Sequence, residues 1–206
     1  MPPRAPRLSA SARRAQLIDV GRSVFARRGY EGASVEEIAL RAKVSKPVVY
    51  EHFGGKEGLY AVVVDREMEY VLRRITEAIA QGSPRDRASA GAVAFLTYVR
   101  DHPDGFAVLA QDAPAKKGAA QMTSLLFAVA ERVTGVFAST FKQHGYDPKL
   151  APIYAHALVG MVTFVGQWWM SARRPPVEEV AAHLEALVWM GLRHLPARPA
   201  RVATRS

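Results

Sequence analysis

The sequence predicts an all-α protein of about nine helices, with a small N-terminal helix-turn-helix domain and a larger helical remainder. Apolar residues recur at helical spacing along most of the chain. Cap residues and prolines divide these runs, and no convincing strand or repeat appears. The chain has no cysteine, which rules out disulfides and thiolate metal sites. We therefore expect a helical protein of a reducing, cytoplasmic compartment.

The positive charge is concentrated at the ends of the chain. The net charge is +9 over 206 residues. Residues 1–56 hold 11 Lys and Arg against 5 Asp and Glu, and residues 57–196 hold 14 of each. Solubility alone needs no such asymmetry, whereas a localised basic surface is typical of a protein that binds a polyanion.

The first predicted helix runs from about Ala10 to Arg28. Leu17 and Phe25 belong to an apolar face at helical spacing, and the arginines lie largely elsewhere. Gly29 is well placed to end this helix in a left-handed conformation.

Two short helices follow, separated by a tight turn. Ser34 and Glu37 form a capping-box pattern that opens the second helix. Ser45 is expected to cap the third helix, whose first turn tolerates Pro47. The pair at 54–55, Gly-Gly, ends it. This arrangement predicts a helix-turn-helix whose second helix enters the major groove of DNA.

The remaining helices are bounded by glycines, prolines and polar cap residues. The predicted ranges are 56–79, 84–102, 104–113, 115–144, 148–173 and 177–194. Residues 10–55 are predicted to form the DNA-binding domain and 56–195 a ligand-binding and dimerisation domain. Residues 1–9 and 196–206 are expected to be disordered tails.

The outward side chains of the third helix suit DNA recognition. Lys46 can reach a guanine or a phosphate, Val48 offers a methyl surface to thymine, and Glu51 can accept a hydrogen bond from cytosine N4. Tyr50 and His52 can donate to phosphates. Ser34 and Lys56 each lie at a helix N-terminus, which also attracts phosphate. The competing interpretation is a helical hairpin with a solvated polar face.

The same stretch carries a family resemblance. VSKPVVYEHFGGKEGLY follows a capped Ser-x-x-x-Ile-Ala helix, and together they resemble the DNA-binding domain of the tetracycline-repressor (TetR) family. The resemblance implies a nine-helix homodimer whose first three helices bind a palindromic operator, and whose remainder binds a small ligand that releases DNA in most members. The positions that contact DNA in the family fall on Ser34, Ser45, Lys46, Pro47, Val48, Tyr50, His52 and Lys56.

Two departures from the family pattern matter. Lys43 occupies the turn position where the family usually has glycine, so we expect some backbone strain there. Pro47 and Val48 stand where many members have small or hydroxylated residues. The base preference therefore cannot be copied from a relative.

Residues 150–172 contain no formal charge, a length that could span a membrane. Polar residues interrupt the segment, and Asp147 with Pro148 caps it like a soluble helix, so we expect a buried helix and no membrane association. In the family resemblance, this helix and the last one form a dimer seam. The residues predicted for the interface are Phe164, Trp168, Leu184, Leu187, Val188, Gly191 and Leu192.

The middle helices are rich in aromatic residues, which suit either a plain core or an apolar ligand cavity with polar anchors. Few acidic residues lie on their inward faces, so a neutral or weakly anionic hydrophobic ligand is expected rather than a cationic one. The residues predicted to contact it are Tyr98, Phe106, Thr123, Phe127, His156, Thr163 and Gln167.

No catalytic or metal-binding pattern appears in the sequence. The histidines lack metal-ligand spacing, and a phosphate loop, a nucleophile elbow and a close carboxylate pair are all missing. We therefore expect no metal, no cofactor and no enzymatic activity. Two alternatives remain to a dimeric, ligand-responsive repressor: a small all-α metabolite-binding protein or enzyme without specific DNA binding, and a protein that coats or bends DNA without an effector.

Overall fold

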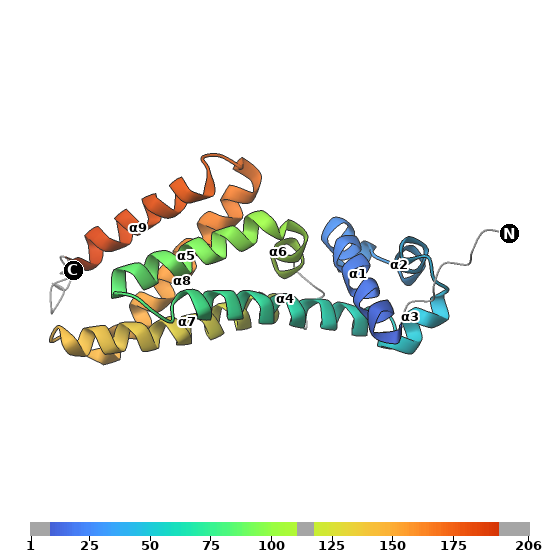
Figure 1. Ribbon diagram of the computed structural model, residues 1–206, viewed down its shortest axis with the longest axis horizontal. Helices are drawn as coiled ribbons and strands as arrows, with labels where there is room; N and C mark the ends of the chain where they lie inside the picture. Colours follow the sequence, from blue (N-terminus) through green and yellow to red (C-terminus); the bar gives the residue numbers. More distant parts are fainter. Residues whose placement is uncertain (1–8, 111–117, 194–206) are drawn as a thin grey trace, which may run out of the picture. The chain divides into compact units, whose positions relative to one another are not determined.

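The computed structural model describes residues 9–110 and 118–193, and all regular structure in these ranges is helical (Figure 1). This confirms the all-α prediction. The elements are α1 (Ala10–Gly32), α2 (Val35–Ala42), α3 (Lys46–Phe53), α4 (Lys56–Ala78), α5 (Pro84–Asp101), α6 (Pro103–Ala110), α7 (Gly118–Gln143), the 3-10 turn η1 (Pro148–Leu150), α8 (Ala151–Ala172) and α9 (Val177–Arg193).

Most helix boundaries lie within two residues of the predicted ones. Gly29 interrupts α1 with φ of 69°, and Gly54 ends α3 with φ of 73°. Two starts differ. α6 begins at Pro103, before the predicted cap Asp104, and α8 is preceded by the 3-10 turn η1. The predicted start of the seventh helix, the end of the ninth and nearly all of the two tails lie outside the described residues.

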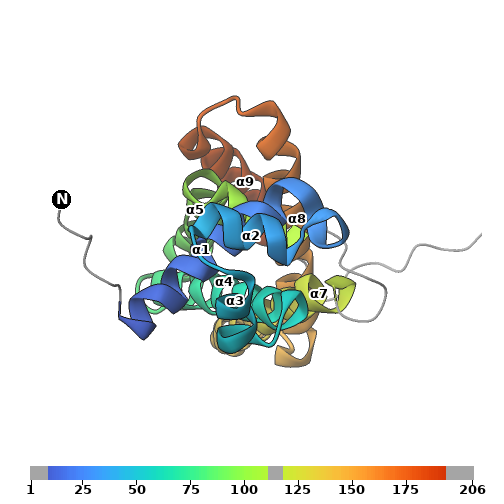
Figure 2. The same ribbon diagram turned by 90° about the vertical axis from the view of Figure 1, so that its right-hand side faces the viewer.

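The chain forms two compact units, each made of two segments of the sequence. The first comprises Met1–Tyr70 and His102–Thr123, and the second comprises Val71–Asp101 and Ser124–Ser206. In the first unit, α1 packs against α6. It also packs against α2, which in turn packs against α3 (Figure 2). In the second unit, α5 packs against α8 and α9. The helix α4 contributes to both units.

The inner face of α3 packs into the core of the first unit. Val49 on α3, Ile38 on α2 and Phe25 on α1 are fully buried. Leu59 on α4 is also fully buried, and a methyl group built at Gly21 would come within 3.0 Å of it. The absence of a side chain at Gly21 therefore lets α1 approach α4 closely.

The second unit has an apolar core and a conspicuously apolar surface. Leu96 and Ala155 are fully buried, and Trp169 donates its indole N–H to the Pro175 carbonyl at 2.7 Å, which ties the end of α8 to the turn before α9. In contrast, Phe164 on α8 and Leu187 on α9 are 74% and 63% exposed. These side chains lie on the surface of a single chain.

Candidate functional site

The turn between α2 and α3 has helix-turn-helix geometry. Ser34 caps α2, and its hydroxyl accepts a hydrogen bond from the Glu37 amide at 3.1 Å, as predicted. Lys43 then adopts the left-handed conformation, with φ of 55° and ψ of 45°. The Val44 amide donates to the Ala39 carbonyl at 3.0 Å and closes the turn. The predicted strain at Lys43 is present, because a non-glycine residue rarely adopts this conformation.

Ser45 occupies the N-cap of α3 but does not cap it through its side chain. The residue has extended dihedrals and makes no side-chain capping hydrogen bond. The predicted capping bond is therefore wrong, although the predicted helix start is correct. Pro47 in the first turn has no backbone N–H, so the first turn of α3 has one fewer donor that a cap must satisfy.

The outer face of α3 presents most of the predicted DNA-contacting residues. Lys46, Pro47, Tyr50 and Glu51 are exposed, with Tyr50 54% exposed. Val48 and His52 are half-buried at the rim, as is Ser34 at the start of α2. These residues form one surface, which we call the α3 face. Whether they contact DNA stays a prediction.

Lys46 is engaged by a carboxylate in the free protein. Its ammonium nitrogen lies 2.5 Å from a Glu36 carboxylate oxygen on α2. The hydrogen bond from Lys46 lowers the pKa of the Glu36 carboxyl below its ordinary value. Both side chains are more than half exposed, so the pair is exchangeable with solvent ions and phosphates.

The side chain of Lys56 joins the start of α4 to the end of α1, whereas the sequence predicted a phosphate contact for this residue. Its ammonium donates to the Tyr30 carbonyl at 2.9 Å and to the Glu31 carbonyl at 3.5 Å. The same nitrogen lies 4.4 Å above the centre of the Tyr30 ring. A phosphate contact from the Lys56 side chain would compete with these interactions. A phosphate contact from the backbone N–H groups at the start of α4 would not.

Arg14 is a residue that sequence reasoning missed. Its guanidinium donates to the His52 carbonyl at 3.1 Å and lies 4.5 Å above the Phe53 ring. The first helix thereby fixes the last turn of α3. Because 38 residues separate Arg14 from His52, no local pattern could have revealed the contact.

A cavity in the second unit lies among α4, α5, α7 and α8. It has a volume of about 70 Å³, several times the roughly 10–15 Å³ needed by one water molecule. Its wall is mostly apolar, with Arg87, Thr140 and Thr163 as the polar side chains among its described lining residues. Apolar members of the wall include Ile75, Ile79, Phe95, Leu125, Val133 and Val162.

Only one of the predicted ligand residues, Thr163, lines this cavity. Tyr98 and Phe106 are 3% and 1% exposed and belong to the packed core. The other four are exposed on the surface: Thr123, Phe127, His156 and Gln167. The aromatic content of the sequence therefore did not distinguish cavity wall from core and surface.

The predicted dimer residues divide into exposed and buried ones. Phe164, Trp168, Leu187 and Gly191 are exposed, and Val188 is half-buried. Leu184 is only 7% exposed and faces the core of its own chain. The side chain of Leu192 lies outside the described residues.

Two helical segments in the described part of the chain pass a length and composition test for membrane spans: Thr123–Gln143 and Pro148–Ala172. Core helices of soluble proteins pass the same test. About a third of the apolar window in the second segment is buried within one chain. Most of the residues in this window are therefore not buried by the chain itself.

Within the described ranges, no group of three or more His, Cys, Asp or Glu residues is placed to hold a metal ion. The exposed polar and apolar groups of the α3 face suit recognition of DNA. Its exposed groups can donate to phosphates, accept from bases and contact apolar base edges. The fold and this face define a helix-turn-helix regulatory protein.

Residues 17–63 match the model for bacterial regulatory proteins of the tetR family, and residues 84–191 match the model for the tetracyclin repressor-like C-terminal domain. The chain belongs to the TetR family and is a DNA-binding transcriptional regulator.

Two of the similar proteins span nearly the whole chain, and a third spans half of it. The chain is 29% identical to the HTH-type transcriptional activator FasR of Mycolicibacterium smegmatis over 94% of its own length and 89% of that protein. It is 34% identical over 105 residues to the nicotine-responsive repressor HdnoR of Paenarthrobacter nicotinovorans, which covers 51% of this chain and 54% of the relative. A TetR-like regulator from Rhodococcus sp. RHA1 superposes with a TM-score of 0.77 at 28% identity, covering 91% of this chain and all of that one.

Proposed function

We propose that the protein is a homodimeric repressor that binds a palindromic operator through the α3 face and leaves it when a small hydrophobic ligand binds. The observation that carries the proposal is the α3 face itself. Exposed polar groups project from a helix whose inner side is fully buried at Val49 and whose last turn is fixed by Arg14. A rigid helix with a free polar face suits insertion into a groove.

The residues of the α3 face take separate tasks in this proposal. Lys46, Val48 and Glu51 contact base edges, where guanine, the thymine methyl group and cytosine N4 are their partners. Tyr50, His52 and Ser34 position the helix on phosphates, together with Ser45 and the backbone start of α4 at Lys56. Pro47 contacts the DNA through its apolar ring. On binding, the ammonium group of Lys46 would exchange its contact with the Glu36 carboxylate for one with the DNA.

A two-fold dimer supplies the second copy of the α3 face. One such face offers few base contacts, whereas two faces about one helical turn of DNA apart, or a multiple of it, read a palindrome. The exposed apolar residues Phe164, Trp168 and Leu187 on α8 and α9 support pairing through these helices. Covering them by a second chain removes the apolar surface from water.

The cavity supports the ligand response. Its wall is apolar and contains no acidic residue among the described lining, so it suits a hydrophobic ligand that is neutral or anionic. The relatives include a named activator and a nicotine-responsive repressor. A promoter fused to a reporter gene would give the direction of regulation here.

We propose that the protein acts in the cytoplasm without enzymatic activity, cofactor or membrane association.

Selection of bound DNA from a random pool tests this function. The full-length protein should enrich a palindrome, because a symmetric dimer presents two identical reading surfaces. Enrichment of a single half-site would contradict the dimer. No enrichment over random duplex would contradict sequence-specific binding and favour a metabolite-binding protein, and binding that no ligand reverses would favour a protein that only coats DNA.

A further inference from the structure

The cavity of the second unit has one formally charged group among its described lining residues, and that group is the guanidinium of Arg87 on α5. Its Nε donates to the Ile79 carbonyl at 2.7 Å, which fixes the side chain beside the end of α4. The remaining guanidinium nitrogens are not needed for that bond. A guanidinium offers five N–H donors, most of which stay available.

No carboxylate in the described part of the chain forms an ion pair with Arg87. The neighbouring acidic groups are already committed elsewhere. Asp86 accepts from the Ser83 hydroxyl at 2.6 Å. Glu185 accepts from Arg85 at 2.8 Å and from Ser89 at 2.7 Å. Among the described residues, the Arg87 guanidinium therefore has a carbonyl partner at Ile79 and no carboxylate partner.

Two hydroxyl groups also lie on the cavity wall. Thr163 on α8 is 7% exposed and lines the same cavity. Thr140 on α7 lines it too, and its hydroxyl donates to the Val136 carbonyl at 3.0 Å. A hydroxyl on the cavity wall can donate to or accept from a polar group of a bound ligand.

We infer that the cavity binds an amphipathic monoanion, a carboxylate with an elongated apolar body, whose charge pairs with Arg87. This inference rests on the proposed ligand response and specifies its chemistry. A single guanidinium matches the charge of one carboxylate and can bind it in a forked geometry. A dianionic phosphate would retain a net charge beside apolar walls.

The shape of the cavity supports an elongated body. On α5 the lining extends from Arg87 to Phe95, and on α4 from Val71 to Ile79. Each interval is eight residues, or about 12 Å of helix. Apart from Arg87, the residues of these two intervals that line the cavity are apolar: Val71, Ile75, Ile79, Gly91, Ala92 and Phe95. A hydrocarbon segment can therefore extend along the helices while its carboxylate stays at Arg87.

Calorimetry with the full-length protein tests the inference, using decanoate, decan-1-ol and decylamine as probes. These share one chain and differ in charge. Decanoate should bind at least roughly tenfold more tightly than the alcohol or the amine. Equal binding of the three probes, or no binding by any of them, would overturn the inference.

Variants then assign the charge to Arg87. Arg87→Gln should reduce decanoate affinity to the level of the alcohol and leave the alcohol unchanged. Arg87→Lys, which keeps the charge but loses the fork, should be intermediate. Arg74→Gln is the matched control, since Arg74 is an exposed residue of α4 outside the cavity wall. Unfolding midpoints without probe check that each variant is folded. Unchanged decanoate affinity in folded Arg87→Gln would contradict the assignment.

A parallel measurement of DNA release separates this inference from the proposed function. If decanoate binds in an Arg87-dependent manner and DNA remains bound, the ligand response fails while the anion site stands. If a neutral ligand releases DNA equally from the wild-type protein and Arg87→Gln, the ligand response stands and the anion site fails.

Discussion

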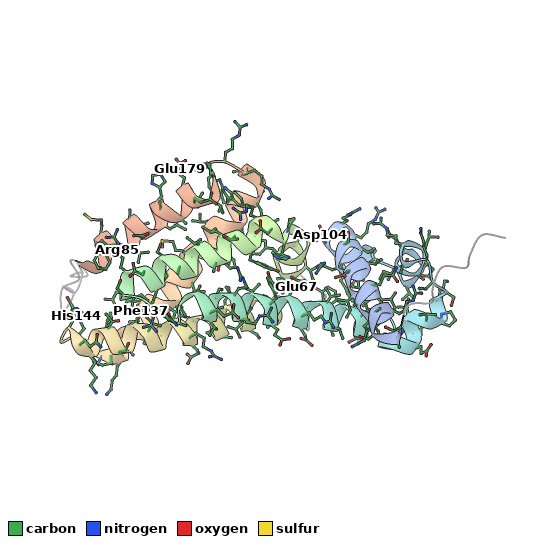
Figure 3. The ribbon with its side chains drawn as sticks, in the orientation of Figure 1. Glu67, Arg85, Asp104, Phe137, His144 and Glu179 are labelled. Carbon is green, nitrogen blue, oxygen red and sulfur yellow. The ribbon has the colours of Figure 1, made fainter. Side chains whose placement is uncertain are left out.

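The guanidinium of Arg22 on α1 donates to a carboxylate oxygen of Glu67 on α4 at 2.9 Å, within the first compact unit. The Glu67 side chain is 8% exposed and that of Arg22 31% exposed. Burial alone lowers the pKa of Arg22, but the hydrogen bond and charge of Glu67 outweigh it, and the pKa is raised above its ordinary value. Figure 3 marks Glu67 on α4. The pair ties the first helix to the long helix that continues into the second unit.

Replacing Glu67 with Gln should destabilise the protein by about 1–3 kcal/mol, because the half-buried guanidinium of Arg22 loses its buried carboxylate partner and keeps only the exposed Asp19 at 3.1 Å. The free energy of unfolding in urea gives the effect. Glu77→Gln is the control, since Glu77 lies in an exposed pair with Arg73 at 3.9 Å and should cost less than about 0.5 kcal/mol. Equal losses in the two variants would contradict the structural role of the Arg22–Glu67 pair.

Replacing Lys43 with Gly should stabilise the protein by about 0.5–1 kcal/mol. Lys43 has φ of 55°, a conformation that costs a residue with a Cβ about 1–2 kcal/mol and costs glycine little. Part of that gain is lost through the greater freedom of glycine in the unfolded chain. Lys43→Ala removes the same side chain without relieving the backbone and should leave the urea midpoint nearly unchanged. A midpoint that falls in Lys43→Gly would contradict the strain.

Gly58 on α4 should not tolerate even alanine. A Cβ built there would lie 1.9 Å from the Phe53 carbonyl oxygen, so the junction of α3 and α4 would have to move. We expect Gly58→Ala to lower stability by roughly 2–3 kcal/mol and to weaken DNA binding. Gly135→Ala on α7 meets no atom within 4 Å and should be neutral or stabilising by up to about 1 kcal/mol. Thermal unfolding followed by circular dichroism compares the two, and a stable Gly58→Ala protein would show that this contact is not rigid.

Placing a charge on the apolar surface of α8 should separate the proposed dimer. Phe164 is 74% exposed in a single chain, so Phe164→Glu should leave the helical content intact. At a paired surface, the uncompensated charge should raise the dimer dissociation constant at least about a hundredfold, as sedimentation equilibrium would show. Leu40→Glu makes the same type of change at a 78% exposed residue of α2 and should remain dimeric. A dimeric Phe164→Glu protein would move the interface elsewhere.

Local sequence patterns predicted the helix boundaries well, because glycine, proline and cap residues act within one helical turn. Gly29 and Gly54 have positive φ as expected, and Ser34 caps α2. The left-handed Lys43 was also predictable, since the turn needs that conformation whatever residue occupies it.

The tasks of individual side chains were less predictable, since they depend on contacts distant in sequence. Lys56 binds the Tyr30 carbonyl 26 residues away, a contact that its position at a helix start does not reveal. Leu184 and Leu187 share an apolar helix, yet one faces the core of its own chain and the other faces solvent. Arg87 went unnoticed because a charged residue near a helix start is typical of a solvated position.

The central claim, that the α3 face reads DNA, is tested most directly by fluorescence anisotropy with the DNA selected from the random pool. Lys46→Ala should bind this DNA roughly tenfold more weakly, and the slope of log affinity against log salt should fall by about one, since one cation no longer displaces counterions. Glu36→Gln, which releases Lys46 from its carboxylate, should bind at least as tightly as the parent. If Lys46→Ala binds the selected DNA with the affinity and salt dependence of the parent, the α3 face is not the surface that reads DNA.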